Sequence, residues 1–284
     1  MNQPTIAVTG ATGHIGGLVA AHLDTAGRAQ RLLVRDPASP RLPQLGSVTE
    51  VARIDYANQD LSQAALQGVE VLFMVSAHES PTRTAEHAAF IDAAAAAGVR
   101  HVVYTSFAAA APDATFTLAR DHYATEEHLK VSGMAWTFLR DTFYIDFMEQ
   151  LVGTDGVIRG PAGSGRCAIV ARADVARVAA TVLLDPDAHA GNTYDLTGPQ
   201  ALSLADVARI INDVRGRTVT FHDETIEEAY TSRASYGAPP WQLDAWVSTY
   251  TAIGSNVMAD PTDAVERITG TPPTSLDDFL RGGR

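Results

Sequence analysis

The sequence predicts an α/β fold built on a doubly wound parallel sheet, with a smaller α/β lobe at its C-terminal end. Short apolar segments alternate with helix-like segments through the first half of the chain, which is the pattern of βαβ units. Val71–Val75 and Val102–Thr105 are apolar on both faces, as strands covered by helices on each side must be. A glycine-rich turn follows directly on the first apolar segment. Together these observations predict a Rossmann-type sheet.

The elements of the first half follow from this alternation. We expect strands at Thr5–Thr9, Gln30–Val34, Glu50–Ile54, Val69–Val75, His101–Thr105 and Ala135–Leu139, and helices at Ile15–Ala26, Asp60–Leu66, Ala85–Ala97 and Asp121–Ser132. Gly27, Gly68, Gly98 and Gly133 each stand near a predicted helix end. Glycine there permits the left-handed turn that ends a helix.

The second half is less regular. We expect a loop or hairpin at Gly153–Gly165, helices at Ala173–Leu184 and Ser203–Val214, strands at Asn192–Leu196 and Val219–His222, and then a helical pair with an aromatic stretch, Trp241–Tyr250. Ser203 is the expected N-cap of its helix, with Asp206 at the third helical position. We therefore expect a first domain at residues 1–150, to which residues 170–198 return, and a smaller lobe at 151–284.

Composition excludes several classes of protein. With 46% hydrophobic and 19% charged residues, the chain of 284 residues is too apolar to be disordered and can bury a large core. The formal net charge of -12 repels nucleic acid and anionic lipid, so we expect neither as a partner. The absence of a long apolar run and of a signal-peptide pattern predicts a cytoplasmic protein. The single cysteine, Cys167, and the scattered histidines predict no metal site.

The glycine-rich turn is the strongest local signal. Gly10, Gly13 and Gly16 form a G-x-x-G-x-x-G pattern between a strand and a helix. The first glycine allows a tight turn, the second a close approach to a pyrophosphate, and the third close packing of helix on strand. Thr12, His14 and Ile15 complete the turn, and the free N–H groups of the helix suit a phosphate. The pattern predicts a dinucleotide site; the alternative is a structural turn.

The end of the second strand indicates which dinucleotide binds. Arg35 suits the 2′-phosphate of NADP(H), whereas the acid Asp36 that follows suits the ribose of NAD(H). We favour NADP(H), with NAD(H) as the second choice; Arg35 as a solvated surface residue is the alternative. Asp55 and Tyr56, after the third strand, either flank the adenine or are ordinary turn residues.

Later strand ends supply further candidates, because ligands of open parallel sheets bind at the carboxyl ends of the strands. Ser76, Thr105, Ser106 and Phe107 are candidates for the cofactor site, and His78, Phe107, Tyr144 and Trp241 are candidates for the substrate site. Phe107 and Tyr144 are able to stack on a flat acceptor, and Trp241 to cover it. Core packing is the alternative for all three aromatic residues.

Several motifs together resemble the NmrA-like atypical short-chain dehydrogenases and reductases, in particular the branch of type 2 NAD(P)H:quinone oxidoreductases and triphenylmethane reductases. The motifs are Thr9–Gly16, Leu33–Pro37, Ala97–Ser106, Ala124–Arg140, Ala171–Asp174, Tyr194–Leu196 and Gly270–Leu276. The resemblance implies a Rossmann domain and a smaller lobe that hold nicotinamide and substrate between them. It also implies NADPH as hydride donor to quinones or planar dyes, and Arg35 as the ligand of the 2′-phosphate.

The catalytic Tyr-x-x-x-Lys pair of ordinary short-chain dehydrogenases is missing. Tyr123 is followed four residues later by Glu127, and the only lysine, Lys130, lies too far along the helix to replace the pair. The resemblance places His122 where related reductases have their lysine. Either His122 bonds the nicotinamide ribose and acts as an acid near its usual pKa of about 6.5, or it is a satisfied helix residue and no side chain acts as an acid.

Three functions compete. The first is an NADPH-dependent oxidoreductase that transfers hydride to a quinone or a similar planar conjugated acceptor, a small-molecule substrate. The second is a non-catalytic NADP(H)-sensing regulator of the NmrA type, which the missing Tyr–Lys pair would suit. The third is a reductase or isomerase that acts on another metabolite. The sequence does not determine the oligomeric state, and a homodimer is one possible assembly.

Overall fold

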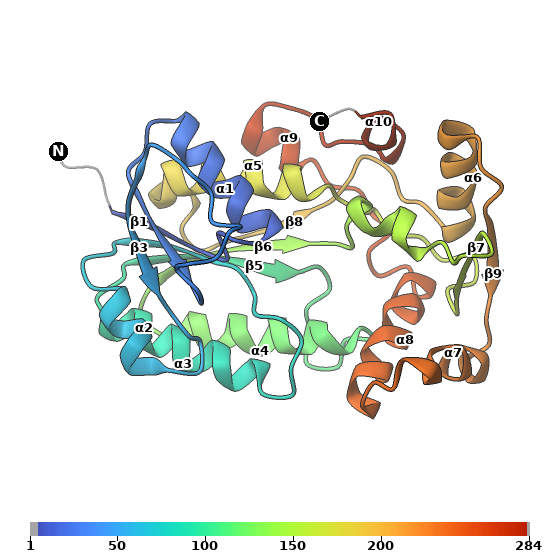
Figure 1. Cartoon of the computed structure of the whole chain (residues 1–284), viewed down its shortest axis with the longest axis horizontal. Helices are drawn as coiled ribbons and strands as arrows, with labels where there is room; N and C mark the ends of the chain where they lie inside the picture. Colours follow the sequence, from blue (N-terminus) through green and yellow to red (C-terminus); the bar gives the residue numbers. More distant parts are fainter. Residues whose placement is uncertain (1–4, 283–284) are drawn as a thin grey trace. The chain divides into compact units, whose positions relative to one another are not determined.

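The computed structural model describes residues 5–282, which divide into two compact units (Figure 1). Unit 1 comprises the chain up to Ser106 together with Asp121–Arg140 and Val175–Tyr194. Unit 2 comprises Phe107–Arg120, Asp141–Asp174 and the chain from Asp195 onward.

A seven-stranded sheet in the order β3-β2-β1-β4-β5-β6-β8 forms the centre of the fold. Its strands are β1 (Ile6–Thr9), β2 (Gln30–Val34), β3 (Val48–Arg53), β4 (Val71–Met74), β5 (His101–Phe107), β6 (Ala135–Asp141) and β8 (Asn192–Leu196). The pairs formed by β1 to β5 are parallel, as the sequence predicts. The strand order reverses between β1 and β4, which is where sheets of this kind bind ligands.

The predicted strands are confirmed, with differences at some ends. β2 and β8 begin and end at the predicted residues, and β5 and β6 each run two residues further than predicted. β3 begins at Val48 rather than Glu50. It is an edge strand whose residues are all partly buried or exposed, so burial of apolar residues does not mark where it starts.

Helices cover both faces of the sheet (Figure 1). One face carries α1 (His14–Thr25) and α5 (Arg172–Leu184); the other carries α2 (Gln59–Ala65), α3 (Arg83–Ala96) and α4 (Thr117–Val131). α3 begins earlier than predicted because its first two residues, Arg83 and Thr84, are polar and lack the apolar periodicity on which the prediction depended. α4 begins at Thr117 rather than at Asp121. The glycines at 27, 68, 98 and 133 have positive φ angles of 65°, 76°, 83° and 82°, as their position at helix ends predicts.

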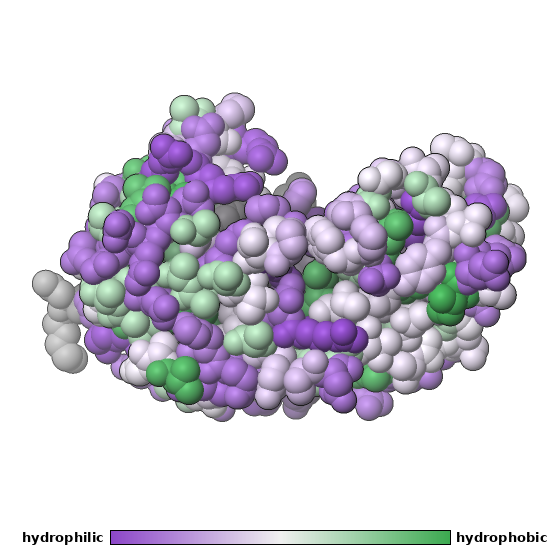
Figure 2. All heavy atoms as spheres, turned by 90° about the horizontal axis from the view of Figure 1, so that it is seen from below, coloured by the Kyte–Doolittle hydropathy of each residue, from purple (hydrophilic) through white to green (hydrophobic). Residues whose placement is uncertain are grey.

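The core between the sheet and α2–α4 is apolar and aromatic. Phe90 of α3, Tyr104 of β5 and Phe138 of β6 are fully buried, and Trp136 stacks on Phe138 with ring centroids 4.1 Å apart. On the outer side of these helices hydrophilic residues predominate, and hydrophobic residues form separate spots (Figure 2, left half). The helices therefore turn their apolar sides to the sheet. Among the described residues, no helix is long and apolar enough to cross a membrane.

Unit 2 contains a small two-stranded sheet and several helices. Its elements are η1 (Ile145–Leu151), β7 (Val157–Gly160), α6 (Leu204–Arg215), β9 (Thr220–Asp223), α7 (Ile226–Arg233), η3 (Ala234–Tyr236), α8 (Pro240–Gly254), α9 (Ala264–Thr269) and α10 (Leu276–Leu280). The capping box predicted for α6 is present: Ser203 accepts from the Asp206 N–H, and the Asp206 carboxylate accepts from the Ser203 N–H. A short 3-10 helix, η2 (Pro186–His189), belongs to unit 1.

The expectation of a loop or hairpin at Gly153–Gly165 is confirmed in part. An antiparallel bridge between Val152 and Ile158 closes a turn, but the segment also contains β7, which pairs in parallel with β9. The partner of β7 lies far along the sequence, so the local glycine pattern carries no information about it.

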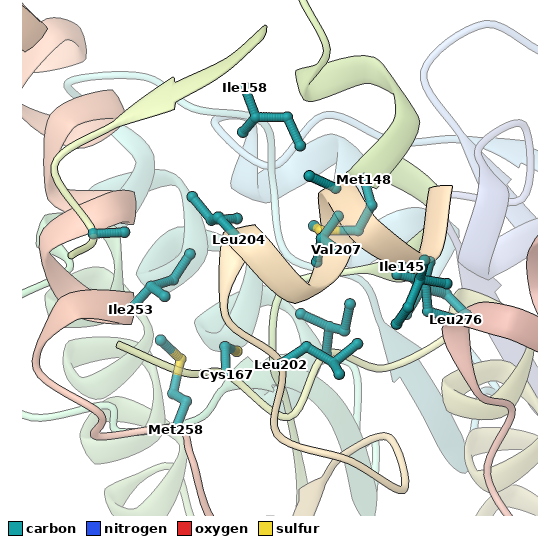
Figure 3. Close-up of a cluster of buried hydrophobic side chains, with 14 of the residues drawn as sticks. Ile145, Met148, Ile158, Cys167, Leu202, Leu204, Val207, Ile253, Met258 and Leu276 are labelled. Atoms are coloured by element: carbon teal, nitrogen blue, oxygen red, sulfur yellow. The ribbon is translucent and has the colours of Figure 1, made fainter. Parts of the chain in front are cut away.

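The core of unit 2 gathers around α6 (Figure 3). Leu204 and Val207 lie among side chains from η1, β7, α8 and α10, which include Met148, Ile158 and Ile253. Cys167 lies in the same cluster, and burial raises the pKa of its thiol to about 12. A thiol in such surroundings is unreactive.

Candidate functional site

A cavity of about 570 Å³ lies in unit 1 at the carboxyl ends of β1 to β4, where the strand order reverses. Most of the residues predicted from sequence meet here: Gly10, Thr12, Gly13, His14, Ile15, Gly16, Arg35, Asp55, Tyr56, Ser76 and His78. Arg41, Ala77 and Glu86 also line it. The cavity is the place where an α/β sheet of this topology holds a ligand.

The glycine-rich turn between β1 and α1 forms one wall of this cavity. Gly10 has a φ angle of +65°, and its carbonyl accepts from the N–H of Gly13 at 2.8 Å. A Cβ on Gly16 would lie 2.4 Å from the Gly10 oxygen, so only glycine lets α1 pack this close to β1. Gly13 caps α1 without a side-chain hydrogen bond, and no acidic residue stands in the first turn. The first N–H groups of α1 are therefore available to an anion.

Two arginines line the cavity near β2. Both Arg35 and Arg41 are exposed. The carboxylate of Asp36 instead accepts from the backbone N–H of Ala38 at 2.9 Å, and Asp36 is not among the residues that line the cavity. This end of the cavity therefore carries two cations that suit a phosphate. Sequence reasoning missed Arg41 because its proline-rich loop has no periodic pattern.

Tyr56 forms a fixed part of the cavity wall. Its hydroxyl donates to the carbonyl of Val75 at 2.8 Å and lies 3.0 Å from the hydroxyl of Thr9. Its ring stacks on Phe90 with centroids 4.1 Å apart. Burial raises the pKa of Tyr56 far above its usual value, so this residue does not exchange protons near neutral pH.

Three residues predicted for the cofactor site do not line this cavity. Thr105 accepts from the N–H of Ser76 at 2.9 Å and so supports the wall from behind. Ser106 donates to the buried carboxylate of Glu126 at 2.6 Å. Phe107 lines a second cavity of about 350 Å³ in unit 2, formed largely by apolar residues from Phe107–Ala111, Asp113–Phe116, Ala119, Ala252 and Val257–Met258. The rings of Phe107 and Phe116 lie 4.9 Å apart.

His122 is buried inside unit 1, where both ring nitrogens have partners. Nε2 lies 3.1 Å from Nη2 of Arg83, and Nδ1 lies 2.9 Å from the hydroxyl of Tyr104. Because a guanidinium can only donate, Nε2 accepts and Nδ1 carries the hydrogen. Burial, followed by the nearby Arg83, lowers the pKa of His122 well below its usual value. This geometry favours the interpretation in which the ring stays neutral.

The other predicted residues have local partners. The hydroxyl of Tyr144 donates to the carboxylate of Asp141, and burial followed by that charge raises the pKa of Tyr144. Trp241 is half-buried at the start of α8 and lines neither of the two cavities. Lys130 pairs with Glu127 at 2.6 Å on the surface, as its distance from the Tyr-x-x-x-Lys position suggests. Within residues 5–282 no cluster of His, Cys, Asp and Glu is able to hold a metal ion.

The sheet order, the glycine turn and the cavity at the strand reversal define a protein of the Rossmann class with the geometry of a dinucleotide site. Residues 2–239 match the NmrA-like family model. The chain belongs to the NmrA-like family, which confirms the resemblance predicted from its motifs.

Comparison with known proteins places reductases among its relatives. The chain is 33% identical to an NAD(P)H azoreductase of Xenophilus azovorans, over 97% of this chain and 96% of that protein. It is 32% identical to quinone oxidoreductase 2 of Escherichia coli, over 95% of this chain and 96% of that protein.

Solved structures similar to this chain also include reductases. The E. coli NADPH-dependent quinone oxidoreductase complexed with NADPH has a TM-score of 0.88 at 31% identity, covering 98% of this chain and 99% of that chain. Triphenylmethane reductase of Citrobacter sp. complexed with NADP(H) has a TM-score of 0.87 at 31% identity, covering 98% of this chain and 100% of that chain. NmrA, a negative transcriptional regulator, shares the fold at 18% identity and a TM-score of 0.78.

Proposed function

We propose that this chain is an NADPH-dependent oxidoreductase that transfers hydride to a quinone or a similar planar conjugated acceptor. Two arginines of the cavity in unit 1 carry the proposal: Arg35 and Arg41 line it after β2, and Asp36 is bonded within its own loop. The names of the relatives, an azoreductase and a quinone oxidoreductase, support a reductase that takes conjugated acceptors. NAD(H) is the weaker alternative cofactor.

The residues of the cavity fit NADPH by their chemistry. The N–H groups at the start of α1 would hold the pyrophosphate, with Gly13 leaving room for its approach. Arg35 and Arg41 would bind the 2′-phosphate, and Asp55 with Tyr56 would border the adenosine. When bound, NADPH supplies the hydride for the reaction.

We propose the second cavity, in unit 2, as the acceptor pocket. Phe107 and Phe116 offer ring faces for a flat molecule, and the alanine run from Ala108 to Ala111 leaves room beside them. Asp113 is the only charged side chain that lines it among the described residues. His78, Tyr144 and Trp241 stay predictions as substrate contacts.

We propose that His122 works as a positioning residue rather than as an acid. Its ring hydrogen is directed to Tyr104, and its other nitrogen accepts from Arg83. The proton that a reduced quinone needs beyond the hydride would then come from solvent. Hydride transfer to such acceptors depends mainly on orientation and exclusion of water.

We further propose a cytoplasmic protein with a small-molecule substrate and no nucleic-acid partner. A net charge of -12 supports the exclusion of nucleic acid. Unit 1 would form the cofactor domain and unit 2 the substrate lobe. The bounds predicted from sequence, 1–150 with 170–198 and 151–284, differ from these units because Phe107–Arg120 and Asp141–Asp174 belong to unit 2. A homodimer stays a prediction.

The test mixes purified protein with NADPH and a panel of quinones and azo or triphenylmethane dyes, and follows the absorbance of the reduced nicotinamide. We expect consumption of NADPH with at least one acceptor, and slower consumption of NADH. The missing Tyr–Lys pair favours a regulator as the second candidate function. No consumption with any acceptor, together with tight and unequal binding of NADP+ and NADPH, would establish that second candidate.

A further inference from the structure

The backbone of Val75–Ala77, at the carboxyl end of β4, is held by side chains from several neighbouring elements. These three residues line the cavity of unit 1. Thr9 accepts from the N–H of Val75 at 2.8 Å, and Tyr56 donates to its carbonyl at 2.8 Å. The N–H of Ser76 donates to Thr105 of β5. The end of β4 is therefore hydrogen-bonded to side chains from both neighbouring strands, β1 and β5.

Two residues of α3 hold the next residue, Ala77. The N–H of Ala77 donates to Nε2 of His87 at 2.8 Å, and Nε of Arg83 donates to the carbonyl of Ala77 at 3.0 Å. Arg83 and His87 stand one helical turn apart, so both reach the same peptide segment. His87 is fully buried and Arg83 is 5% exposed, yet neither lines the cavity.

α4 orients these two side chains. Because Nε2 of His87 accepts from Ala77, Nδ1 carries the ring hydrogen and donates to Thr125 at 2.8 Å, and Thr125 donates to the Asp121 carbonyl at 2.7 Å. Arg83 contacts His122 through Nη2, while Nη1 lies 3.5 Å from the Asp121 carboxylate without a hydrogen bond. The direction of every hydrogen bond from Ala77 through His87 and Thr125 to the Asp121 carbonyl is therefore fixed.

A buried guanidinium and a buried imidazole are costly to desolvate. Here both are directed at the two polar groups of a single loop residue in the cavity wall. A loop that only closes a turn would not need a buried arginine and a buried histidine, because the alanine side chain itself forms no hydrogen bond. We infer that Arg83 and His87 are positioning residues for the cofactor: they lock Ala77, and with it the Val75–Ala77 wall, in the conformation that binds the dinucleotide.

This inference assumes the cofactor site proposed above, and NADPH itself is the probe. His87→Leu removes the acceptor for Ala77, whereas His87→Gln supplies an amide oxygen near the position of Nε2. The matched control is His101→Leu. His101 is also buried, lies 2.9 Å from Thr137 through Nε2, and stands at the opposite end of β5 from the cavity. NADPH dissociation constants and thermal unfolding are measured for all of these proteins.

We expect His87→Leu to raise the NADPH dissociation constant by about tenfold, the loss expected for one buried hydrogen bond that orders the site. His87→Gln should recover most of this affinity. His101→Leu should lower the unfolding temperature about as much as His87→Leu does, but it should leave the NADPH dissociation constant within about twofold of that of the unaltered protein. With an acceptor, His87→Leu should raise KM for NADPH more than it lowers kcat at saturation.

Arg83→Gln provides a second variant if His87→Leu does not fold, because its shorter side chain no longer reaches the Ala77 carbonyl, and it should also weaken NADPH binding. Unchanged NADPH affinity in folded His87→Leu or Arg83→Gln would overturn the inference while the cofactor site stands. Equal losses in His87→Leu and His101→Leu would overturn it too. If the unaltered protein fails to bind NADPH, the proposed function itself fails, and the positioning role with it.

Discussion

At the scale of single residues, we expect selectivity between the two coenzymes to depend on where three charged side chains lie. Arg35 and Arg41 line the cavity, and the carboxylate of Asp36 is bonded to the N–H of Ala38. An acid beside Arg35 would repel a 2′-phosphate. Asp36, which follows Arg35 in sequence, does not line the cavity, whereas Asp55 and Glu86 line it.

We predict that Arg35→Ala and Arg41→Ala each raise the dissociation constant of NADPH by roughly 10- to 100-fold, because each removes a cation from the 2′-phosphate. The constant for NADH should change by less than about threefold. Calorimetry with both coenzymes measures the effect. Asp36→Asn keeps an oxygen for Ala38 and serves as the control with unchanged affinity. Equal losses for NADPH and NADH would refute the role of the arginines.

At the scale of elements, the turn between β1 and α1 contains one glycine needed for packing and another expected to leave room for a ligand. A Cβ on Gly16 would lie 2.4 Å from the Gly10 oxygen and 2.5 Å from the Thr9 oxygen, both backbone atoms. A Cβ on Gly13 would meet only the Gly10 oxygen, at 3.2 Å. The two glycines therefore serve different purposes in the same turn.

We predict that Gly16→Ala lowers the free energy of unfolding by roughly 2–4 kcal/mol, because α1 must move away from β1. Gly13→Ala should cost about 1 kcal/mol or less, and should still weaken NADPH binding because the methyl group occupies the path of the pyrophosphate. Urea unfolding and NADPH titration of both variants test this. A Gly13→Ala protein with full affinity would contradict the phosphate role of the turn.

At the scale of the whole molecule, buried neutral histidines make stability depend on pH. Burial, followed by the charge of Arg83, lowers the pKa of His87 to about 3, and burial lowers that of His122 in the same direction. In the unfolded chain both rings regain a pKa near 6.5. Below that pH the unfolded state binds protons that the folded state does not, so folding stability falls as the pH falls.

We predict that the free energy of unfolding is nearly constant above about pH 7 and then decreases by up to about 1.4 kcal/mol per pH unit for each of these two histidines. The window from about pH 6.5 to 5 separates the histidines from carboxylates with lowered pKa values, which lose their contribution only at lower pH. His101, whose pKa burial lowers to about 4, and His22, whose pKa burial also lowers, add to the decrease in this window. Urea titrations at several pH values measure it, and His87→Gln should decrease less steeply. A flat profile down to pH 5 would show that these rings take up protons in the folded state.

Much of this molecule could be predicted from sequence because the signals are local. Apolar patterns with periods of two and 3.6 residues indicate the strands and helices of unit 1, and glycines mark its helix ends. Gly10, Gly13, Gly16 and Arg35, each predicted from its place beside a strand, all line one cavity. Each of these signals depends on neighbours within a turn or a strand, which the chain order contains.

Tertiary structure alone decided the rest. It brought Arg41 to the cavity from a loop without periodicity, paired β7 with a distant parallel strand, and directed the hydroxyl of Ser106 to Glu126. It also brought Arg83 and His87 to Ala77, with partners on α4. The physical reason is that a hydrogen-bond partner across packed elements depends on how those elements meet in space, and residue spacing along one chain does not record that.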